Sequence, residues 1–488
     1  MRNYGDDCPI AAQAAGQGAL ALIRTSGRGT LELMAKIFSR PRRLRDCPGN
    51  TVVHGWILGE QKRIDEVLIS VYRAPRSYTG EEGADISCHG GTAAVGAVLG
   101  ALRGAGFQDA LPGEFTFRAF MNGKMDLTRC ESVMEIVSAR TTTALGRAAL
   151  RLSGALERKI RDIRDVLLET LSAVELYLDY PEDELEGGEA PEVFPRRKMA
   201  EEALEQLRSL AASYRREQLY QEGALAVIAG QPNAGKSSLF NALLNEERSI
   251  VTENPGTTRD WIEGAVSLEG IPLRLVDTAG LREPEADKKA EAQGIERSRA
   301  LIEEADMVLY VVDGSAGIAP QDEAFIASYR KNKNRNGPFL LPLWNKADLA
   351  EPSNSIREKY PDLTILSAAG GTGLEELCRL MKSLLTEASE TNTAGKDPAE
   401  TDMSIPNTPM PGDGACLPAG LGALRQKELT EKAACALEEA LHLADQKAPL
   451  DLIAPPLREA ADALGEITGE VSTADILEIM FSRFCLGK

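Results

Sequence analysis

The sequence lacks the features that mark secreted and membrane-spanning proteins. Its 8 cysteines occur singly, with no Cys-x-x-Cys pair, which argues against a disulfide framework or a cysteine zinc site and favours a reducing compartment. No stretch approaches the roughly 18 uninterrupted apolar residues that a membrane helix needs. The N-terminus, from Met1 to Asp7, has neither the basic start nor the apolar core of a signal peptide. We therefore expect a cytoplasmic protein that does not enter a membrane.

A basic excess is also missing. There are 55 Lys and Arg residues against 74 Asp and Glu, so the formal net charge is −19. Because a large nucleic-acid footprint normally needs a basic face, any nucleic acid is bound locally or held mainly by a partner. The hydrophobic share of 43% and the charged share of 26% are typical of a globular chain. A length of 488 residues suggests about two to four domains.

The most informative stretch that is present is a glycine-rich loop. An apolar run at 224–229 precedes the loop Gly-Gln-Pro-Asn-Ala-Gly-Lys-Ser-Ser at 230–238, and apolar residues at helical spacing follow at 239–244. Strand, loop and helix in this order are the context of a phosphate-binding loop, whose N–H groups face the phosphates at the helix start. Lys236 would reach the β- and γ-phosphates, and the Ser237 hydroxyl would ligate Mg²⁺. The alternative, a glycine turn before an ordinary helix, leaves this combination unexplained.

Two later segments indicate guanine as the base. Asn345-Lys346-Ala347-Asp348 follows an apolar run, and a carboxylate there can accept hydrogen bonds from guanine N1–H and from the N2 amine, which adenine lacks. Ser367-Ala368-Ala369 follows the expected strand at 363–366, where a backbone N–H can reach guanine O6. An isolated Asn-Lys-x-Asp is a weak signal, but this one lies at the right depth after the phosphate loop. The sequence therefore predicts a GTP site.

Residues that sense the γ-phosphate and Mg²⁺ are expected between these segments. Asp277-Thr278-Ala279-Gly280 follows an apolar run, so that Asp277 would hold Mg²⁺ through water and the Gly280 N–H would sense the γ-phosphate. Thr258 would complete the Mg²⁺ shell and be released on hydrolysis. Leu281 stands where many small GTPases have the glutamine that orients water, and nothing in the sequence identifies an arginine finger. Water positioning and charge stabilisation must therefore come from elsewhere.

Hydrophobic periodicity divides the chain into five parts. Strand patterns at 19–24, 51–58 and 67–72 and a helical pattern at 91–99 indicate a small α/β domain at the N-terminus. The expected parts are an N-terminal α/β domain (1–122), a first helical part (123–220), a nucleotide domain (221–386), a disordered linker or insertion (387–422) and a second helical part (423–488).

The nucleotide domain is expected to be inserted into one helical domain, because helical patterns flank it on both sides. Its strand patterns at 271–276, 307–312 and 339–343 alternate with helical ones, so its sheet should be mainly parallel and doubly wound. The acidic run at 179–184 is interpreted as a solvated loop rather than a metal site. The segment 387–422 has almost no large apolar residues, which is typical of disorder.

These motifs resemble the tRNA modification GTPase family called MnmE or TrmE. The phosphate loop, Pro255-Gly256-Thr257-Thr258-Arg259-Asp260 and the stretch 277–283 match the GTPase set, which related translation GTPases share in part. More specific are Gly294-Ile295-Glu296-Arg297-Ser298 and the stretch 112–127. The most specific is the ending, with Leu-Gly-Glu-Ile-Thr-Gly-Glu at 464–470 and Phe-Ser-Arg-Phe-Cys-Leu-Gly-Lys at 481–488. The resemblance covers nearly the whole chain.

The resemblance implies a folate-binding α/β domain that dimerises, a helical domain and an inserted Ras-like G domain. It implies GTP hydrolysis that depends on potassium and on dimerisation of the G domains. With the flavoprotein partner MnmG, members modify C5 of the wobble uridine of certain tRNAs. A 5-formyl- or 5,10-methylene-tetrahydrofolate supplies one carbon of an aminomethyl-type group, as in carboxymethylaminomethyluridine.

The resemblance also assigns roles to individual residues of this sequence. Glu291 would orient the attacking water, although a solvated helix face is the alternative for this residue and Glu283 is the next candidate. Cys485 either lies near the transferred carbon or is a small buried residue that closes the last helix. The residues implied are Ser237 and Thr258 for Mg²⁺; Asn233, Thr252, Asn254 and Thr257 for K⁺; Arg24, Glu81, Lys124 and Lys488 for folate; and, for GTP, Asn233, Ala234, Gly235, Lys236, Ser237, Ser238, Thr252, Glu253, Asn254, Pro255, Gly256, Thr257, Thr258, Asp277, Thr278, Ala279, Gly280, Asn345, Lys346, Ala347, Asp348, Ser367, Ala368 and Ala369.

The departures from the family pattern lie near the folate end. The family's Pro-Pro-Gly-Arg-Gly-Gly loop is here Ala-Ala-Gly-Gln-Gly-Ala at 14–19, and Phe117 stands where an arginine is usual. Two rival functions remain open. A ribosome-assembly or translation GTPase would share the G-domain motifs but not the N-terminal domain or the ending. A non-enzymatic GTP-sensing scaffold would bind GTP without turnover.

Overall fold

The computed structural model describes residues 4, 7–16, 18–59, 62–179, 194, 196–246, 262–277, 300–331, 338–391, 419–471 and 474–487. The chain forms two compact units. The first combines Met1–Met134, Arg151–Leu204 and Glu428–Lys488, and the second combines Glu135–Leu150 and Glu205–Lys427. Among the described helices, none has the length and apolar character that a bilayer crossing requires.

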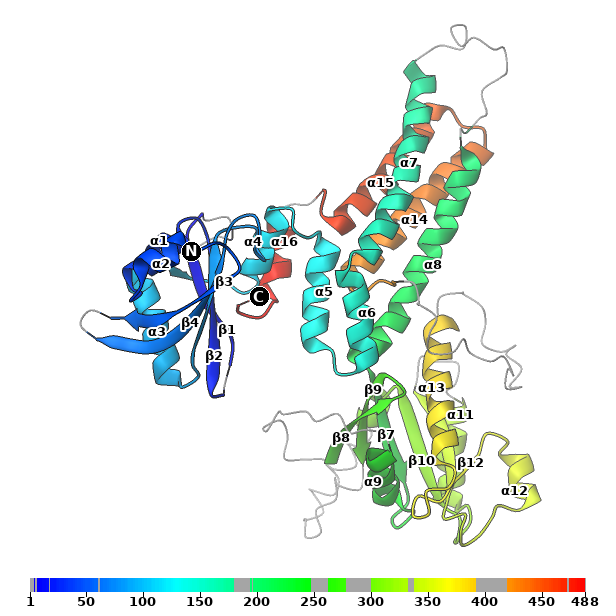
Figure 1. Cartoon of the computed structure of the whole chain (residues 1–488). Coiled ribbons are helices and arrows are strands. Elements are labelled where there is room, and N and C mark those ends of the chain that lie inside the picture. The colour runs from blue at the N-terminus through cyan, green and yellow to red at the C-terminus, as the bar shows by residue number, and fades with distance from the viewer. Residues whose placement is uncertain are drawn as a thin grey trace. The chain divides into compact units, whose positions relative to one another are not determined.

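The first unit begins with a six-stranded sheet in the order β3-β4-β5-β2-β1-β6 (Figure 1). Neighbouring strands are antiparallel except for β1 and β6, which are parallel. Buried residues of three helices pack on one face of the sheet. The elements are β1 (Ile10–Ala15), β2 (Leu20–Ser26), β3 (Thr51–Leu58), β4 (Arg63–Tyr72), β5 (Gly83–His89), β6 (Gln108–Asp109), α1 (Thr30–Lys36), α2 (Pro41–Asp46) and α3 (Thr92–Ala105).

Side-chain alternation determines which face of this sheet is covered. In β4, Asp65, Val67, Ile69 and Val71 are buried while the residues between them are not, the period of two expected for a sheet with one covered face. The predicted strands at 19–24, 51–58 and 67–72 and the predicted helix at 91–99 are present as β2, β3, β4 and α3. Strand β1 was not predicted, because its sequence Ile-Ala-Ala-Gln-Ala-Ala is rich in alanine, which favours helix over strand.

The C-terminal helix packs against helices that follow the sheet in sequence. Helices α4 (Glu114–Met121), α5 (Leu127–Ser138) and α16 (Ala474–Ser482) share an apolar cluster that includes Phe117, Leu127 and Phe481. The rings of Phe117 and Phe481 are 5.4 Å apart and nearly perpendicular, at 86°, a favourable edge-to-face geometry. Phe117, noted above as a departure from the family's usual arginine, is therefore an apolar contact for the C-terminal helix.

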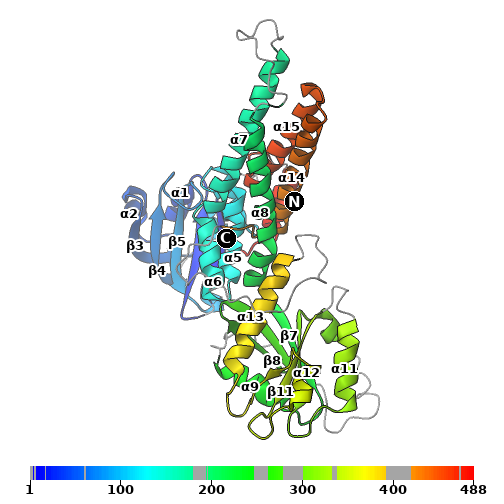
Figure 2. The same cartoon turned by 90° about the vertical axis from the view of Figure 1, so that its right-hand side faces the viewer.

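The remaining helices of the first unit are long. Helices α7 (Ala155–Asp179) and α15 (Leu450–Thr468) lie side by side along their length (Figure 2). Their interface includes a hydrogen bond from Arg164 to the Ala461 carbonyl at 3.2 Å. Helices α8 (Arg197–Glu222) and α14 (Leu424–Asp445) each begin in one unit and end in the other.

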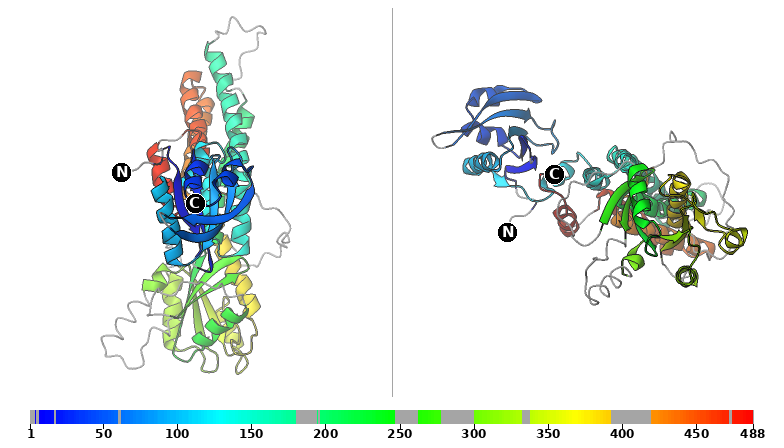
Figure 3. Two further views of the ribbon diagram at one scale, coloured as in Figure 1. Left: turned by 60° about the vertical axis from the view of Figure 1, so that its left-hand side comes forward. Right: turned by 90° about the horizontal axis from the view of Figure 1, so that it is seen from below.

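The second unit contains a six-stranded sheet in the order β12-β11-β10-β7-β9-β8. All neighbours are parallel except β8 and β9, which form an antiparallel hairpin. Helices α9 and α13 pack on one face and α11 on the other, so the sheet is covered on both sides (Figure 3). The elements are α6 (Thr142–Leu152), β7 (Ala224–Gly230), α9 (Lys236–Glu246), β8 (Ile262–Leu268), β9 (Ile271–Asp277), β10 (Met307–Asp313), α11 (Pro320–Lys331), β11 (Phe339–Asn345), α12 (Asn354–Lys359), β12 (Thr364–Ile365) and α13 (Leu374–Thr391).

The predicted mainly parallel, doubly wound sheet is confirmed, and β7, β9, β10 and β11 lie where apolar runs were found. Strand β10 is buried along nearly its whole length, as expected for a strand covered on both faces. Strand β8 was not predicted, because Ile-Glu-Gly-Ala-Val-Ser-Leu mixes polar residues and glycine with few large apolar ones. Two ends of the expected linker at 387–422 are ordered: α13 continues to Thr391, and Leu421 is fully buried.

Candidate functional site

The glycine-rich loop connects β7 to α9 at the carboxyl end of the second sheet. Lys236 begins α9 and its ammonium donates to the carbonyls of Gly230 at 3.1 Å and Gln231 at 2.8 Å. The Ser237 hydroxyl donates to Asp277 Oδ2 at 2.7 Å, and Asp277 is 1% exposed. Ile228 pairs with Asp277 across the parallel strands β7 and β9, so the carboxylate and the loop lie at the same edge. A hydroxyl beside a carboxylate is a donor set that suits Mg²⁺.

Asn345 ties the phosphate loop to the segment predicted for the base. Its amide donates to the Ala234 carbonyl at 2.8 Å, and its Oδ1 accepts from the Ala368 N–H at 3.0 Å. The residue is 2% exposed, so both bonds are shielded from water. Ser367 donates to Asp348 Oδ1 at 2.5 Å. One amide side chain therefore fixes the relative positions of the loop and the turn at 367–369.

A close approach explains the glycine at position 235. Gly235 has a φ of +96°, and a Cβ there would lie 2.2 Å from Asn345 Nδ2. Asn233, two residues earlier, also has a positive φ, of 63°. The loop therefore depends on a left-handed backbone and on the missing side chain of Gly235.

Asp313 is a site residue that the sequence reasoning missed. It ends β10 at the same sheet edge and accepts from Lys346 Nζ at 2.6 Å and from the Ser315 hydroxyl at 2.5 Å. Partial burial opposes ionisation, but the bonds from Lys346 and Ser315 outweigh it and lower the pKa of Asp313. The signal was available, because the carboxyl ends of neighbouring parallel strands meet at one edge of a sheet.

The structure brings together the predicted residues of four segments. These are 233–238, Asp277, 345–348 and 367–369, all at the carboxyl ends of β7, β9, β11 and β12. The other predicted residues lie outside the described ranges, namely Thr252, Glu253, Asn254, Pro255, Gly256, Thr257, Thr258, Thr278, Ala279, Gly280 and Glu291. Of the residues predicted for K⁺, Asn233 alone falls within the described ranges, and of those for Mg²⁺, Ser237 alone does.

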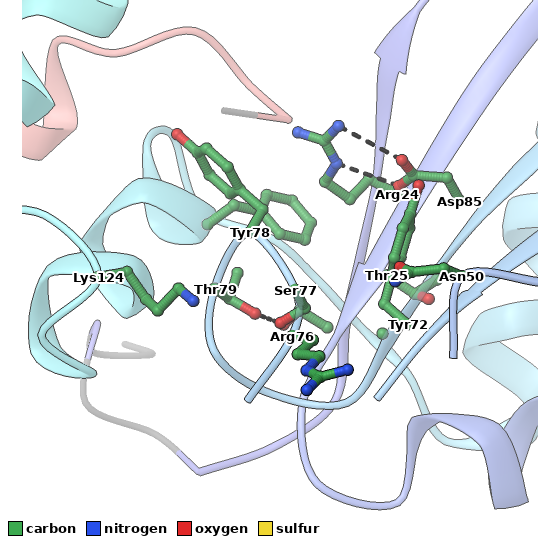
Figure 4. Close-up of a pocket in the computed structure, with 13 residues that line it drawn as sticks. Arg24, Thr25, Asn50, Tyr72, Arg76, Ser77, Tyr78, Thr79, Asp85 and Lys124 are labelled. Atoms are coloured by element: carbon green, nitrogen blue, oxygen red, sulfur yellow. Dashed lines mark hydrogen bonds and ion pairs between the residues drawn. The ribbon is translucent and has the colours of Figure 1, made fainter. Parts of the chain in front are cut away.

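A second site is a pocket of about 320 Å³ in the first unit. Arg24 and Lys124, both predicted for folate, line it on opposite sides (Figure 4). Arg24 is paired with Asp85 at 3.1 Å, and its guanidinium carbon lies 5.5 Å from the centre of the Tyr78 ring. Burial raises the pKa of Tyr78, so its hydroxyl stays protonated. Lys124 Nζ donates to the Pro75 carbonyl at 3.1 Å.

Glu81, the third residue predicted for folate, is not among the residues that line this pocket. It accepts from the Ser26 hydroxyl at 2.7 Å and from Arg118 at 3.1 Å. Arg118 also pairs with Glu114, a carboxylate that is 0% exposed. Burial opposes the charge of Arg118, but the bonds to Glu114 and the charge of Glu81 raise its pKa overall. Glu81 is therefore part of an ionic network that contacts the pocket through Ser26, one of its lining residues.

The C-terminal residues lie against the same domain, within one chain. The Gly113 N–H donates to the Cys485 carbonyl at 3.3 Å, and a Cβ on Gly487 would lie 2.7 Å from the Ala14 Cα. The side chain of Cys485 is exposed, which contradicts the alternative of a small buried residue that closes the last helix. Lys488, the fourth residue predicted for folate, lies outside the described ranges.

Two family models match the chain. The "MnmE helical domain" matches residues 127–485, and the "GTP-binding protein TrmE N-terminus" matches residues 9–124. The tRNA modification GTPase MnmE of Treponema denticola is 39% identical, with 100% of this chain and 99% of the relative covered. The chain belongs to the tRNA modification GTPase MnmE family. Its members are GTP hydrolases, and so is this protein.

Another curated MnmE relative, from Carboxydothermus hydrogenoformans, is 38% identical over 97% of both chains. Among solved structures, Era of Aquifex aeolicus is 26% identical over 44% of this chain and 67% of its own, with a TM-score of 0.26. That score is too low to carry an argument about the fold. Membership of the MnmE family therefore rests on the two family models and on relatives that match from end to end.

Proposed function

We propose that this GTP hydrolase binds GTP at the edge formed by β7, β9, β11 and β12 and couples its hydrolysis to the modification of tRNA wobble uridines. The observation that carries the proposal is the double hydrogen bond of Asn345, which joins Ala234 of the phosphate loop to Ala368. It holds the phosphate end and the base end of the site in a fixed relation. A binding energy that depends on such preorganised groups discriminates among nucleotides.

The chain's own groups supply most of what phosphoryl transfer needs. The Lys236 ammonium donates hydrogen bonds to two loop carbonyls. Triphosphate oxygens would replace these carbonyls as acceptors. Ser237 would ligate Mg²⁺ and Asp277 would hold it through water, and the ion would neutralise charge on the β- and γ-phosphates. Asp348, oriented by Ser367, would accept from guanine N1–H and N2, and Ala368 would offer its N–H toward O6. Thr258 would complete the Mg²⁺ shell, and the Gly280 N–H would sense the γ-phosphate.

The missing arginine finger and glutamine suggest that a potassium ion and a glutamate replace them. Asn233, Thr252, Asn254 and Thr257 would hold K⁺ when two G domains associate, because charge that develops on the phosphates needs a fixed positive partner. Glu291 would orient the water. The test is GTP turnover in matched sodium and potassium buffers, together with Glu291→Ala in single turnover. Equal rates in both buffers would refute the potassium role, and an unchanged variant would refute the role of Glu291.

The N-terminal pocket has the chemistry to hold a one-carbon tetrahydrofolate. Its lining combines the cations Arg24, Arg76 and Lys124, the carboxylate Asp85 and the ring of Tyr78. A folate offers a flat ring with amide-like donors and acceptors and an anionic tail, so these groups fit the ligand. Lys488 and Cys485 would approach the pocket from the C-terminus. Deletion of 486–488 should leave GTP hydrolysis intact and reduce folate binding; undiminished folate binding in the truncated chain would contradict this assignment.

The partners follow from the same proposal. The chain would act as a cytoplasmic homodimer with the flavoprotein MnmG, which would carry much of the tRNA surface that the net charge of −19 disfavours here. The product would carry an aminomethyl-type group on C5 of the wobble uridine. Nucleoside analysis of tRNA from cells that lack the protein should show loss of that modification. Re-expression should restore it with the native chain and fail with Lys236→Ala. Unaltered nucleosides in the deleted cells would overturn the proposed function.

A further inference from the structure

A packed junction lies at the opposite ends of the strands from the nucleotide site. Strands β7 and β9, which lead to Lys236 and Asp277, both begin there, next to Gly223. Gly223 has a φ of +83°, and a Cβ on it would lie 2.0 Å from the Pro272 carbonyl oxygen. Helix α8 runs directly into β7 at this glycine. The amino ends of the two strands are therefore in direct backbone contact with the end of a helix.

The β8–β9 hairpin connects this junction to the nucleotide site. Its turn consists of Glu269 and Gly270, with φ values of 45° and 96°, between the paired residues Leu268 and Ile271. Two positive φ values are typical of the tight two-residue turn that matches the twist of a hairpin. The other end of β9 is Asp277, bonded to Ser237. The turn and the Asp277 carboxylate therefore lie at opposite ends of strand β9.

Thr141 joins the turn to helix α6. Its hydroxyl accepts from the Ala144 N–H at 3.1 Å, which caps α6, and donates to the Gly270 carbonyl at 2.8 Å. Thr141 is 7% exposed, so water competes little for these bonds. A Cβ on Gly270 would lie 2.3 Å from Thr143 Oγ1, so α6 rests directly on the turn. A displacement of the turn would break the bond from the residue that caps the helix.

Helix α6 is in turn held rigidly to α8. Arg147 pairs with Glu217 at 2.5 Å, with side chains 10% and 1% exposed, and its guanidinium lies 4.0 Å from the centre of the Tyr220 ring. Gly420 fits against the same carboxylate, since a Cβ there would lie 2.9 Å from Glu217 Oε1. Buried pairs of this kind are strongly destabilised by loss of one partner. The turn of the β8–β9 hairpin therefore packs against α6, which is itself fixed to α8.

We propose that Thr141, which lies outside the predicted nucleotide domain, is a positioning residue for GTP hydrolysis. This inference rests on the proposed GTP site. Through its bond to Gly270, Thr141 fixes the hairpin and with it the position of Asp277 at the far end. Coupling free energies are reciprocal. A movement of β9 that depends on the nucleotide would therefore weaken or strengthen the hydrogen bond between Gly270 and Thr141, the residue that caps α6. The Thr141 bond is then a route by which the state of the nucleotide reaches the helical part of the chain.

The test separates the two bonds of the Thr141 hydroxyl. Thr141→Ser keeps both, Thr141→Asp keeps the helix cap but has no proton to donate to Gly270, and Thr141→Val loses both. Thr142→Val is the matched control, because Thr142 is the exposed neighbour on the same helix. Single-turnover GTP hydrolysis and GTP affinity are measured on the full chain with Mg²⁺ and K⁺. Thermal melting of each variant is recorded in parallel.

We expect Thr141→Asp and Thr141→Val to hydrolyse bound GTP about threefold to tenfold more slowly, which is the size of one hydrogen bond. Their GTP affinity should stay within about twofold, because the phosphate loop and Asn345 are unchanged. Thr141→Ser and Thr142→Val should match the native rate. Equal rates for the Ser and Asp variants would overturn the proposal, since the cap alone would then explain Thr141. Failure of the native chain to hydrolyse GTP would instead refute the proposed function.

Discussion

The nucleotide site and the N-terminal pocket are assembled in opposite ways. Each part of the nucleotide site is a short contiguous motif at the end of a strand, and one parallel sheet brings the strand ends together. The pocket draws Arg24 and Asp85 from two strands, Tyr78 from a loop, and Lys124 from the connection between α4 and α5. A site built from short contiguous motifs can therefore be predicted from the local sequence pattern. A pocket built from side chains that are scattered along the chain cannot be predicted in this way.

The two sites also differ in how their charges are satisfied. In the nucleotide site Lys236 binds loop carbonyls, acceptors that a ligand can replace without leaving a buried charge. In the first unit Arg118 binds the buried Glu114 and also Glu81, so these charges support the fold itself. Removal of the Lys236 charge should therefore impair function, whereas removal of the Arg118 charge should lower stability.

The largest effect is expected for Lys236→Ala. Loss of the ammonium removes the charge that stabilises the transferring phosphoryl group, so hydrolysis should fall by at least about 100-fold. Folate titration of the same variant should be unchanged, because the pocket lies in the other unit. A fall in folate binding of similar size would show that the two sites are not independent.

The second effect is on stability, in Arg118→Met. Two carboxylates would lose their cationic partner, one of them fully buried, which should lower the free energy of unfolding by about 3–5 kcal/mol. Arg103→Met is the control, because Arg103 and Asp109 form an exposed pair with side chains 53% and 62% accessible. That change should cost less than about 1 kcal/mol. Urea denaturation of both variants measures the difference, and equal losses would contradict the buried network.

A glycine pair tests the backbone account of the nucleotide site. Gly235→Ala places a Cβ 2.2 Å from Asn345 Nδ2, whereas Gly317→Ala, also at a positive φ of +77°, meets nothing within 4 Å. Both changes incur the left-handed penalty of about 1 kcal/mol, but Gly235→Ala should additionally displace Asn345. We expect GTP affinity to fall at least about tenfold for Gly235→Ala only. Equal affinities in a nucleotide titration would remove the role given to the Asn345 bridge.

The smallest effect concerns two carboxyls with opposite shifts. Burial, together with the Glu157 side chain, raises the pKa of Asp126 to about 6, whereas the pKa of Asp313 is lowered. A raised folded pKa means that the folded state binds the proton more tightly, so stability is lost as pH rises from about 4 through 6.

Asp126→Asn should therefore flatten the decline in stability over that pH range. Asp313→Asn should act in the opposite sense, because a lowered pKa contributes stability that is lost as pH falls. Urea denaturation from about pH 7.5 down to about pH 2 measures both variants, because the contribution of Asp313 is lost only below the ordinary aspartate pKa. An unchanged pH profile in Asp126→Asn would show that folding does not raise the pKa of this carboxyl.

Short contiguous motifs could be predicted from the sequence, whereas contacts between distant residues could not. The phosphate loop and Asn345–Asp348 were found because their function requires particular backbone conformations, and few sequences adopt them. Asp313 directly follows a predicted strand and was missed because a single aspartate carries no local pattern; only its position at the edge shared with the other strand ends marks it. The partner of Thr141 was out of reach, because Gly270 lies 129 residues away and only the folded hairpin brings them together.

The most direct test of the central claim is a change of nucleotide specificity by Asp348→Asn. Xanthine has a carbonyl where guanine has the N2 amine, so an amide side chain can donate to it where the carboxylate cannot. The variant should lose GTP hydrolysis by at least about 100-fold and gain potassium-stimulated hydrolysis of xanthosine triphosphate. In the presence of the flavoprotein partner and a one-carbon tetrahydrofolate, only the xanthosine nucleotide should then support modification of tRNA by the variant. If Asp348→Asn hydrolyses GTP like the native chain, or if it modifies tRNA without any nucleotide it can hydrolyse, the account of this site is wrong.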